Sequence, residues 1–199
     1  MVRSLEIVFS GRRISLTNKK INRLDEFVFE VSKILERYTD YVVVSGYVSI
    51  LFGRSRGTED VDFIISSLSL ETFERLYNDF LENGFEFINA DDPKELFEML
   101  IEKQAVRVCK RGTIFPNAEI KLPKDKFHLE ALEGKLEVMI NGGKIFISPI
   151  ELQIAYKLYL GGERDIEDAV FLYEIFKDHI DHEKLQYWKS QLGVEEFEL

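Results

Sequence analysis

The stretch at residues 41–65, YVVVSGYVSILFGRSRGTEDVDFII, limits the fold of this chain more than any other part. Its β-branched start predicts a buried strand over 41–44, and the apolar run at 61–65 predicts a second strand. Between them, Ser45-Gly46 predicts a tight turn into a short helical piece that ends at Gly53. Strands that alternate with helical segments in this way indicate an α/β arrangement.

The same alternation continues on both sides of this stretch. Apolar residues at helical spacing predict a helix over about 20–38, with Asn18 as its N-cap. We also expect a strand at 5–9, helices at 70–83 and 92–103, strands at 85–88, 105–110 and 118–122, and a hairpin at 137–147.

The character of the chain changes after Ser148-Pro149, where three helices are predicted at 149–160, 164–178 and 182–192. The length of 199 residues, 45% of them hydrophobic, allows one substantial core with a smaller helical appendage. We therefore expect an α/β (α+β) fold, with a mixed sheet and flanking helices over 1–148. A C-terminal helical subdomain over 149–199 would follow it.

Composition argues against several classes of protein. No stretch of 18 or more apolar residues is present, and the N-terminus lacks the long apolar region of a signal peptide, so we expect no membrane segment. The single cysteine, Cys109, excludes an intramolecular disulfide and favours a cytoplasmic location. Only three histidines occur, which argues against a His/Cys zinc site.

Asp60 and Asp62 are the leading candidates for a metal site. Side chains alternate along a strand, so the two carboxylates project from one face, about 7 Å apart, while Val61 and Phe63 project from the other. Such a pair can hold Mg²⁺, which prefers oxygen ligands, together with a nucleoside triphosphate. The apolar neighbours strengthen this interpretation, because carboxylates placed among them need a reason.

Ser45 and Gly46 form the second candidate part of a site. A glycine turn before a helix offers free N–H groups and a positive dipole end to a phosphate, and Ser45 adds a hydroxyl. The alternative is an ordinary turn, in which Gly46 only permits a positive φ.

Together these features resemble the DNA polymerase β-like nucleotidyltransferase superfamily, and within it the AbiEii/AbiGii-toxin-like group. The first matching stretch covers about 42–65 and contains the glycine turn and Asp60-Val-Asp62. The second runs from Ser148-Pro149 through Lys157 to Arg164-Asp165-x-x-Asp168, and it resembles the lysine and the R-D-x-x-D segment of that group.

The resemblance implies a nucleotidyltransferase fold, in which Ser45 and Gly46 approach the triphosphate and Asp60 and Asp62 hold the metal. Tyr47 departs from the family pattern, because a glycine or serine usually occupies its position. The resemblance further implies site roles for three residues of the second stretch, with a phosphate or nucleotide contact for the lysine: Lys157, Asp165 and Asp168. Snorkelling of the lysine and capping of a helix by the two aspartates are the structural alternatives.

Three further residues are candidates for this site. Glu119 is the best candidate for a third carboxylate on a neighbouring strand, with pairing to Lys121 as the alternative. Arg54 and Arg56, in the loop before Asp60, would clamp phosphates or orient a nucleic acid strand. Alternatively, these arginines neutralise Glu59 and Asp60.

Basic residues are concentrated in two segments of a chain whose net charge is −10. Segment 10–23 has five basic residues and no acid, and segment 103–126 has seven basic residues against two acids. The two segments would either form a phosphate-binding patch, for example for RNA, or be ordinary solvated faces.

Our first hypothesis is an Mg²⁺-dependent nucleotidyltransferase that moves a nucleoside monophosphate from a nucleoside triphosphate to a hydroxyl acceptor. The acceptor would be RNA (by analogy a tRNA end), a protein or a small molecule, and the protein would be a toxin with an antitoxin partner if the group resemblance holds. The second hypothesis is a non-catalytic binding module of a toxin–antitoxin-type system that keeps this fold.

Overall fold

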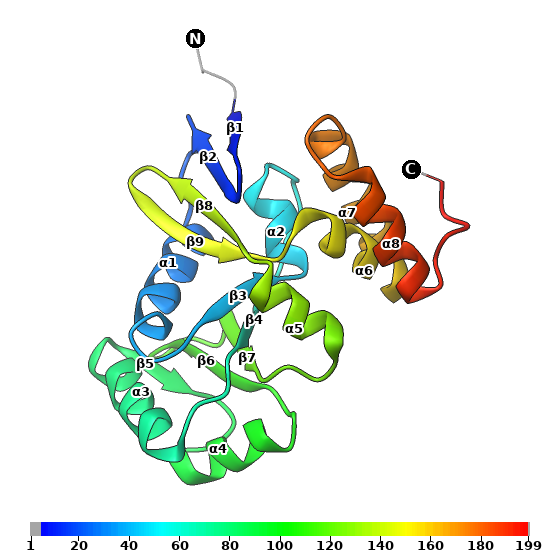
Figure 1. The fold of residues 1–199 in the computed structure, drawn as a ribbon. Coiled ribbons are helices and arrows are strands. Elements are labelled where there is room, and N and C mark those ends of the chain that lie inside the picture. Colours follow the sequence, from blue (N-terminus) through cyan, green and yellow to red (C-terminus); the bar gives the residue numbers. More distant parts are fainter. Residues whose placement is uncertain (1–4, 199) are drawn as a thin grey trace.

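The computed structural model describes residues 5–198 and forms a mixed nine-stranded sheet with helices on both faces (Figure 1). The strand order is β1-β2-β8-β9-β3-β4-β7-β6-β5. The strands are β1 Glu6–Ser10, β2 Arg13–Thr17, β3 Tyr41–Val44, β4 Asp60–Ile65, β5 Phe85–Phe87, β6 Val106–Lys110, β7 Asn117–Lys121, β8 Leu136–Ile140 and β9 Gly143–Ile147. The helices are α1 Arg23–Leu35, α2 Gly46–Leu51, α3 Leu70–Glu82, α4 Pro93–Ile101, α5 Lys126–Glu133, α6 Ile150–Leu160, α7 Glu163–Phe176 and α8 His182–Leu192. The expected α/β fold class is confirmed.

The two strands predicted in the stretch 41–65, β3 and β4, lie in the middle of the sheet. β3 pairs antiparallel with β4, so that Val44 lies opposite Asp62. β4 in turn pairs parallel with β7, so that Asp62 lies opposite Glu119. The polar ends of β3, β4 and β7 therefore meet in the middle of the sheet.

Helices bury the two faces of these central strands in two separate apolar clusters. Val43 and Phe63 belong to the larger cluster, which includes residues of α1 such as Val31. Val42 and Ile64, on the opposite face, pack with residues of α5 and α6 in the smaller cluster: Ala131, Leu132 and Leu152. The face that carries Asp60 and Asp62 is thus the face that α5 and α6 cover.

Three expectations for local structure need correction. α1 begins at Arg23, because Asn22 caps it and forms a reciprocal capping box with Asp25. Asn18, the expected cap, instead has a φ of 62°. The second strand of the N-terminal hairpin, β2, and the helix α5, which Asp125 caps, were both missed.

The three expected C-terminal helices are confirmed as α6, α7 and α8, which lie together at one side of the sheet (Figure 1). The larger apolar cluster continues into them. Phe176, at the end of α7, packs edge-on against Phe9 of β1 and Phe52 after α2, with ring centroids 5.3 and 4.6 Å apart. Within residues 5–198, none of the helices is long and apolar enough to cross a membrane.

The two basic segments do not meet in the sheet. β2 belongs to segment 10–23 and β6 and β7 belong to segment 103–126, and four strands (β8, β9, β3 and β4) lie between β2 and β7. Several of the basic side chains are also paired with acids, for example Arg13 with Glu137 and Lys110 with Glu30. The strands of the two segments therefore lie apart in the sheet, and a shared phosphate-binding patch stays a prediction.

Candidate active site

Asp60 and Asp62 lie on one face of β4, as the strand pattern predicts. Between and after them, Val61 and Phe63 are 1% and 0% exposed, whereas both aspartates keep partial access to solvent. Glu119 lies beside Asp62 on β7 and is 8% exposed. The structure thus brings the three predicted carboxylates to one part of the sheet.

Two basic side chains occupy much of the space around Glu119. Lys121 Nζ donates to Asp62 Oδ1 and also pairs with Glu119 Oε2, each at 2.6 Å. Arg107 donates to Glu119 Oε1 through Nε at 2.8 Å and Nη2 at 2.5 Å. The predicted pairing of Glu119 with Lys121 is therefore present, and Glu119 is not a free ligand in this arrangement.

The electrostatics of the three carboxylates differ. Burial and the negative charges of Asp62 and Glu119 raise the pKa of Asp60. Burial also acts to raise the pKa of Glu119, but the hydrogen bonds and charges of Lys121 and Arg107 outweigh it and lower that pKa. Asp60 is therefore the carboxylate for which an added cation would relieve the most repulsion.

These residues fit a small divalent cation held by two carboxylates. Among residues 5–198 there is no cluster of three or more acidic, histidine or cysteine side chains arranged to hold a metal. Mg²⁺, however, is commonly held by one or two carboxylates together with water and substrate phosphates. The partly exposed Asp60 and Asp62, with the raised pKa of Asp60, match that pattern.

The turn after β3 has an unusual backbone conformation. Ser45 has a φ of 65° and a ψ of −139°, so the positive φ lies at Ser45 and not, as the alternative reading supposed, at Gly46. Gln153 of α6 holds the turn from the other side, since its Nε2 donates to the Ser45 carbonyl at 2.9 Å and its Oε1 accepts from the Ser45 N–H at 3.3 Å.

Gly46 leaves room for a close approach of Arg56. A Cβ atom at Gly46 would lie 2.7 Å from Arg56 Nη2, which is too near for any other residue without a shift of the guanidinium. The glycine therefore lets a cationic side chain lie directly on the turn.

Tyr47 points away from this turn and into the core. Its side chain is 1% exposed, and its hydroxyl donates to Asp25 Oδ1 of α1 at 2.8 Å. Tyr47 departs from the pattern of the resembled family, but its phenol does not lie in the site.

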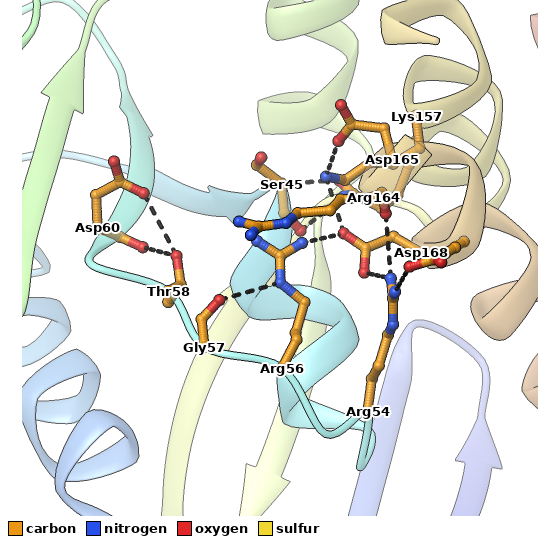
Figure 2. A network of polar contacts seen from close by, with 12 residues as sticks. Ser45, Arg54, Arg56, Gly57, Thr58, Asp60, Lys157, Arg164, Asp165 and Asp168 are labelled. Atoms are coloured by element: carbon orange, nitrogen blue, oxygen red, sulfur yellow. Dashed lines mark hydrogen bonds and ion pairs between the residues drawn. The ribbon is translucent and has the colours of Figure 1, made fainter. Parts of the chain in front are cut away.

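Asp168 of α7 is the centre of a network of ion pairs (Figure 2). Its carboxylate is 0% exposed, and three cations point at it: Arg54 pairs with Oδ1, Arg56 with Oδ2 at 2.5 Å, and Lys157 with Oδ2 at 3.1 Å. Lys157, itself 2% exposed, also donates to Asp165 Oδ1 at 2.5 Å. The two sequence stretches that carried the resemblance therefore meet in space.

Several structural alternatives for these residues are wrong. The ammonium group of Lys157 is buried among acids and does not snorkel to solvent. α7 has Gly162 at its N-cap with no side-chain cap, so neither Asp165 nor Asp168 caps it there. Arg54 and Arg56 pair with acids of α7, not with Glu59 or Asp60.

An open cleft of about 660 Å³ lies beside this network. It is lined by Asp60, by the loop that precedes it and by the start of α7: Arg54, Ser55, Arg56, Gly57, Thr58, Glu59, Arg164 and Glu167. Thr58 Oγ1 donates to the Asp60 carbonyl at 2.8 Å and fixes the end of the loop at β4. One predicted metal ligand, Asp60, and the predicted phosphate clamp, Arg54 and Arg56, therefore share one cleft.

Four site residues were missed in the sequence: Lys121, Arg107, Gln153 and Glu167. In the sequence, Lys121 was considered only as an ion-pair partner of Glu119. Arg107 is on β6, opposite Glu119 on β7, and only the strand register reveals it. Gln153 lies four residues before Lys157 on α6, so helical spacing from Lys157 would have found it.

Comparison with known proteins supports the fold. No sequence-family model and no curated protein sequence matches the chain. Among solved structures, an antigenic nucleotidyltransferase-like protein from Paracoccidioides brasiliensis is 17% identical with a TM-score of 0.50, over 86% of this chain and 87% of that one.

Two structures of the antibiotic-resistance factor ANT(2'')-Ia are also similar. A solution structure is 11% identical with a TM-score of 0.53, over 84% of this chain and 90% of that one. A crystal structure in complex with adenylyl-2''-tobramycin is 15% identical with a TM-score of 0.52, over 85% and 95%. The chain therefore has the fold of nucleotidyltransferase-like proteins.

Proposed function

We propose that this protein is a divalent-metal-dependent nucleotidyltransferase that moves a nucleoside monophosphate from a nucleoside triphosphate to a hydroxyl group. The observation that carries the proposal is the position of Asp60 and Asp62, on one face of β4 beside a cleft lined by Arg54, Arg56 and Arg164. Carboxylates for a cation next to guanidinium groups for phosphates are the two requirements of phosphoryl transfer. The likeness of fold to nucleotidyltransferase-like proteins supports the same reaction class.

Asp60 and Asp62 would hold Mg²⁺. When bound, the cation would neutralise charge on the phosphates and lower the pKa of the attacking hydroxyl. The acceptor hydroxyl gives up its proton to water and its oxygen forms a bond to the α-phosphorus. The bond from that phosphorus to the β-phosphate oxygen breaks, and pyrophosphate leaves with the bonding electrons. Lys121, between Asp62 and Glu119, supplies the positive charge that keeps the carboxylates together before the cation arrives.

Arg56 and Lys157 would orient the triphosphate at the Ser45-Gly46 turn. Asp168 holds both cations in place from the buried side, and Asp165 holds Lys157. Asp165 and Asp168 are therefore positioning residues in this proposal, and Glu119 supports Asp62 through Lys121. Because bidentate guanidinium groups match phosphate geometry, Arg164 at the cleft wall is a further phosphate contact.

The acceptor and the biological setting are further parts of the proposal. The separation of the two basic segments by four strands and the net charge of −10 weigh against a long RNA surface. An RNA end, which needs few phosphate contacts, and a small polyhydroxyl compound both remain suitable acceptors. A role as a toxin with an antitoxin partner rests on the resemblance to the AbiEii/AbiGii-toxin-like group alone. The main support for a non-catalytic binding module was the departure at Tyr47, and the burial of that side chain weakens it.

The test uses nucleoside triphosphates labelled at the α-phosphate, Mg²⁺ and two acceptor pools, total RNA and polyhydroxyl small molecules such as tobramycin. We expect the wild type to transfer label and Asp60→Asn and Asp62→Asn to lose it. Asp40→Asn is the matched control, because Asp40 is 74% exposed and pairs only with Lys135 among the described ion pairs. The proposal fails if the wild type transfers no label and calorimetry detects no binding of Mg²⁺ and nucleotide.

A further inference from the structure

A pocket opens on the face that α5 and α6 cover. It lies beside the proposed triphosphate contacts, Arg56, Lys157 and the Ser45-Gly46 turn, which we call the phosphate corner. The walls of the pocket are mostly apolar or aromatic. Its lining includes Phe127 and His128 of α5, Tyr156 and Lys157 of α6, Ser45 and Ala131. We propose that this pocket binds the nucleobase of the nucleoside triphosphate, an inference that rests on the function proposed above.

The pocket is continuous with the phosphate corner. Ser45 lines it at the turn on which Arg56 lies, and Lys157 lines it from α6 while its ammonium group pairs with Asp168. A ligand whose phosphates contact Arg56 and Lys157 has its other end beside the pocket. The part of a nucleotide that follows its charged phosphates and sugar is a flat, largely apolar base.

The walls suit an aromatic ring. The rings of Phe127 and His128 lie 6.2 and 5.9 Å from that of Tyr156, measured between centroids, so three aromatic side chains border the same space. Stacking on aromatic side chains tolerates any base, because every base has a π-face. The walls therefore provide affinity for a base without requiring one sequence-specific hydrogen bond.

The size of the pocket limits its occupant further. Its volume is about 50 Å³, and one water needs roughly 10–15 Å³ by the same kind of measure, so it holds about four waters. The edge of a flat heterocycle can displace these few waters, whereas a folded peptide is too large for the volume. The size therefore suits the ring edge of a base.

His128 adds a defined hydrogen-bond donor at this border. Its Nδ1 accepts from the Lys124 N–H at 3.1 Å, so in the neutral ring the proton is on Nε2. Burial, the largest influence, lowers the pKa of His128 and favours that neutral form. The ring therefore offers an N–H to ring nitrogens or carbonyl oxygens of a base.

The test compares the binding of Mg²⁺ with ATP and with ribose 5-triphosphate by calorimetry, since these ligands differ only in the base. We expect the wild type to bind ATP about 10- to 100-fold more tightly than ribose 5-triphosphate, the range that base stacking on aromatic side chains provides. Ala131→Leu fills the pocket, and Tyr156→Leu removes an aromatic wall. Each should reduce the ratio of the two affinities toward one. Binding of ribose 5-triphosphate should stay unchanged in both variants and shows that they are folded.

Tyr187→Leu is the matched control, because Tyr187 is 54% exposed on α8 and does not line the pocket. The ratio in this variant should equal that of the wild type. Equal binding of the two ligands by the wild type, or an unchanged ratio in both pocket variants, overturns the base pocket and leaves the proposed function standing. Failure of the wild type to bind either ligand overturns both.

Discussion

Replacement of Asp168 by asparagine is the sharpest test of how this site is built. The substitution keeps the shape of the side chain and removes the one charge that Arg54, Arg56 and Lys157 share. We expect the loop before β4 to lose its attachment to α7 and the protein to lose stability.

The size of the loss follows from what remains paired. Removal of one partner from a buried ion pair costs about 3–5 kcal/mol, because the opposite charge is left uncompensated. Lys157 keeps Asp165 and Arg54 keeps Glu167, while Arg56 has no second acid among the described contacts. The two arginine side chains also retain 15% and 18% exposure. We therefore expect the lower end of that range, about 3 kcal/mol.

Urea denaturation measures this loss. With a slope of about 2 kcal/mol per molar urea, a loss of about 3 kcal/mol lowers the midpoint by about 1.5 M. Glu167→Gln is the control, because Glu167 is 56% exposed and its pair with Arg54 contributes no more than about 1 kcal/mol. A midpoint for Asp168→Asn that matches the control would refute the view that Asp168 organises the three cations.

Three further predictions concern Tyr47, Lys121 and Asp60. Tyr47→Phe should cost about 2 kcal/mol in urea denaturation, because the buried Asp25 loses a donor, while nucleotide binding by calorimetry stays unchanged; a selective loss of binding would place Tyr47 in the site after all. Lys121→Met should raise the affinity for Mn²⁺ roughly tenfold in an electron paramagnetic resonance titration, because it removes a positive charge from Asp62 and Glu119; weaker binding would contradict this reasoning. Deprotonation of Asp60 must accompany metal binding, so Mn²⁺ affinity should fall up to about tenfold per pH unit once the pH drops below the raised pKa of Asp60, and this dependence should be absent in Asp60→Asn.

Much of the fold could be predicted because its signals are local. The strand alternation around Val61 and Phe63 correctly gave the face of Asp60 and Asp62, and the glycine signals correctly gave the break between the last helices. The helix that Asp125 caps was missed because it has only eight residues, although Asp125 and Gly134 mark its two ends. The N-cap of α1 was misplaced since Asn18 and Asn22 are both good caps and only the backbone decides between them.

The candidate site was less predictable, because its contacts join distant parts of the chain. No residue pattern indicated that Arg54 and Arg56 pair with a helix more than 100 residues away. The role of Gly46 also depends on that packing, since the residue leaves space for an approaching guanidinium and does not itself have a positive φ. Such pairings follow from the packing of α7 against α2 and the loop after it, and not from residue spacing.

The helix α7 has a mechanical consequence for the cleft. It spans 14 residues, or about 21 Å, with Asp165 and Asp168 in its first two turns and Phe176 at its last residue. Phe176 packs between Phe9 of the N-terminal hairpin and Phe52 at the end of α2, so the far end of the helix is clamped in the core. Because a helix of this length is stiff, a change in the packing of Phe176 tilts the whole of α7 and shifts its first two turns. The aromatic contacts of the first strand therefore set the angle at which the acids of α7 meet the arginine loop, although no residue of that strand lines the cleft.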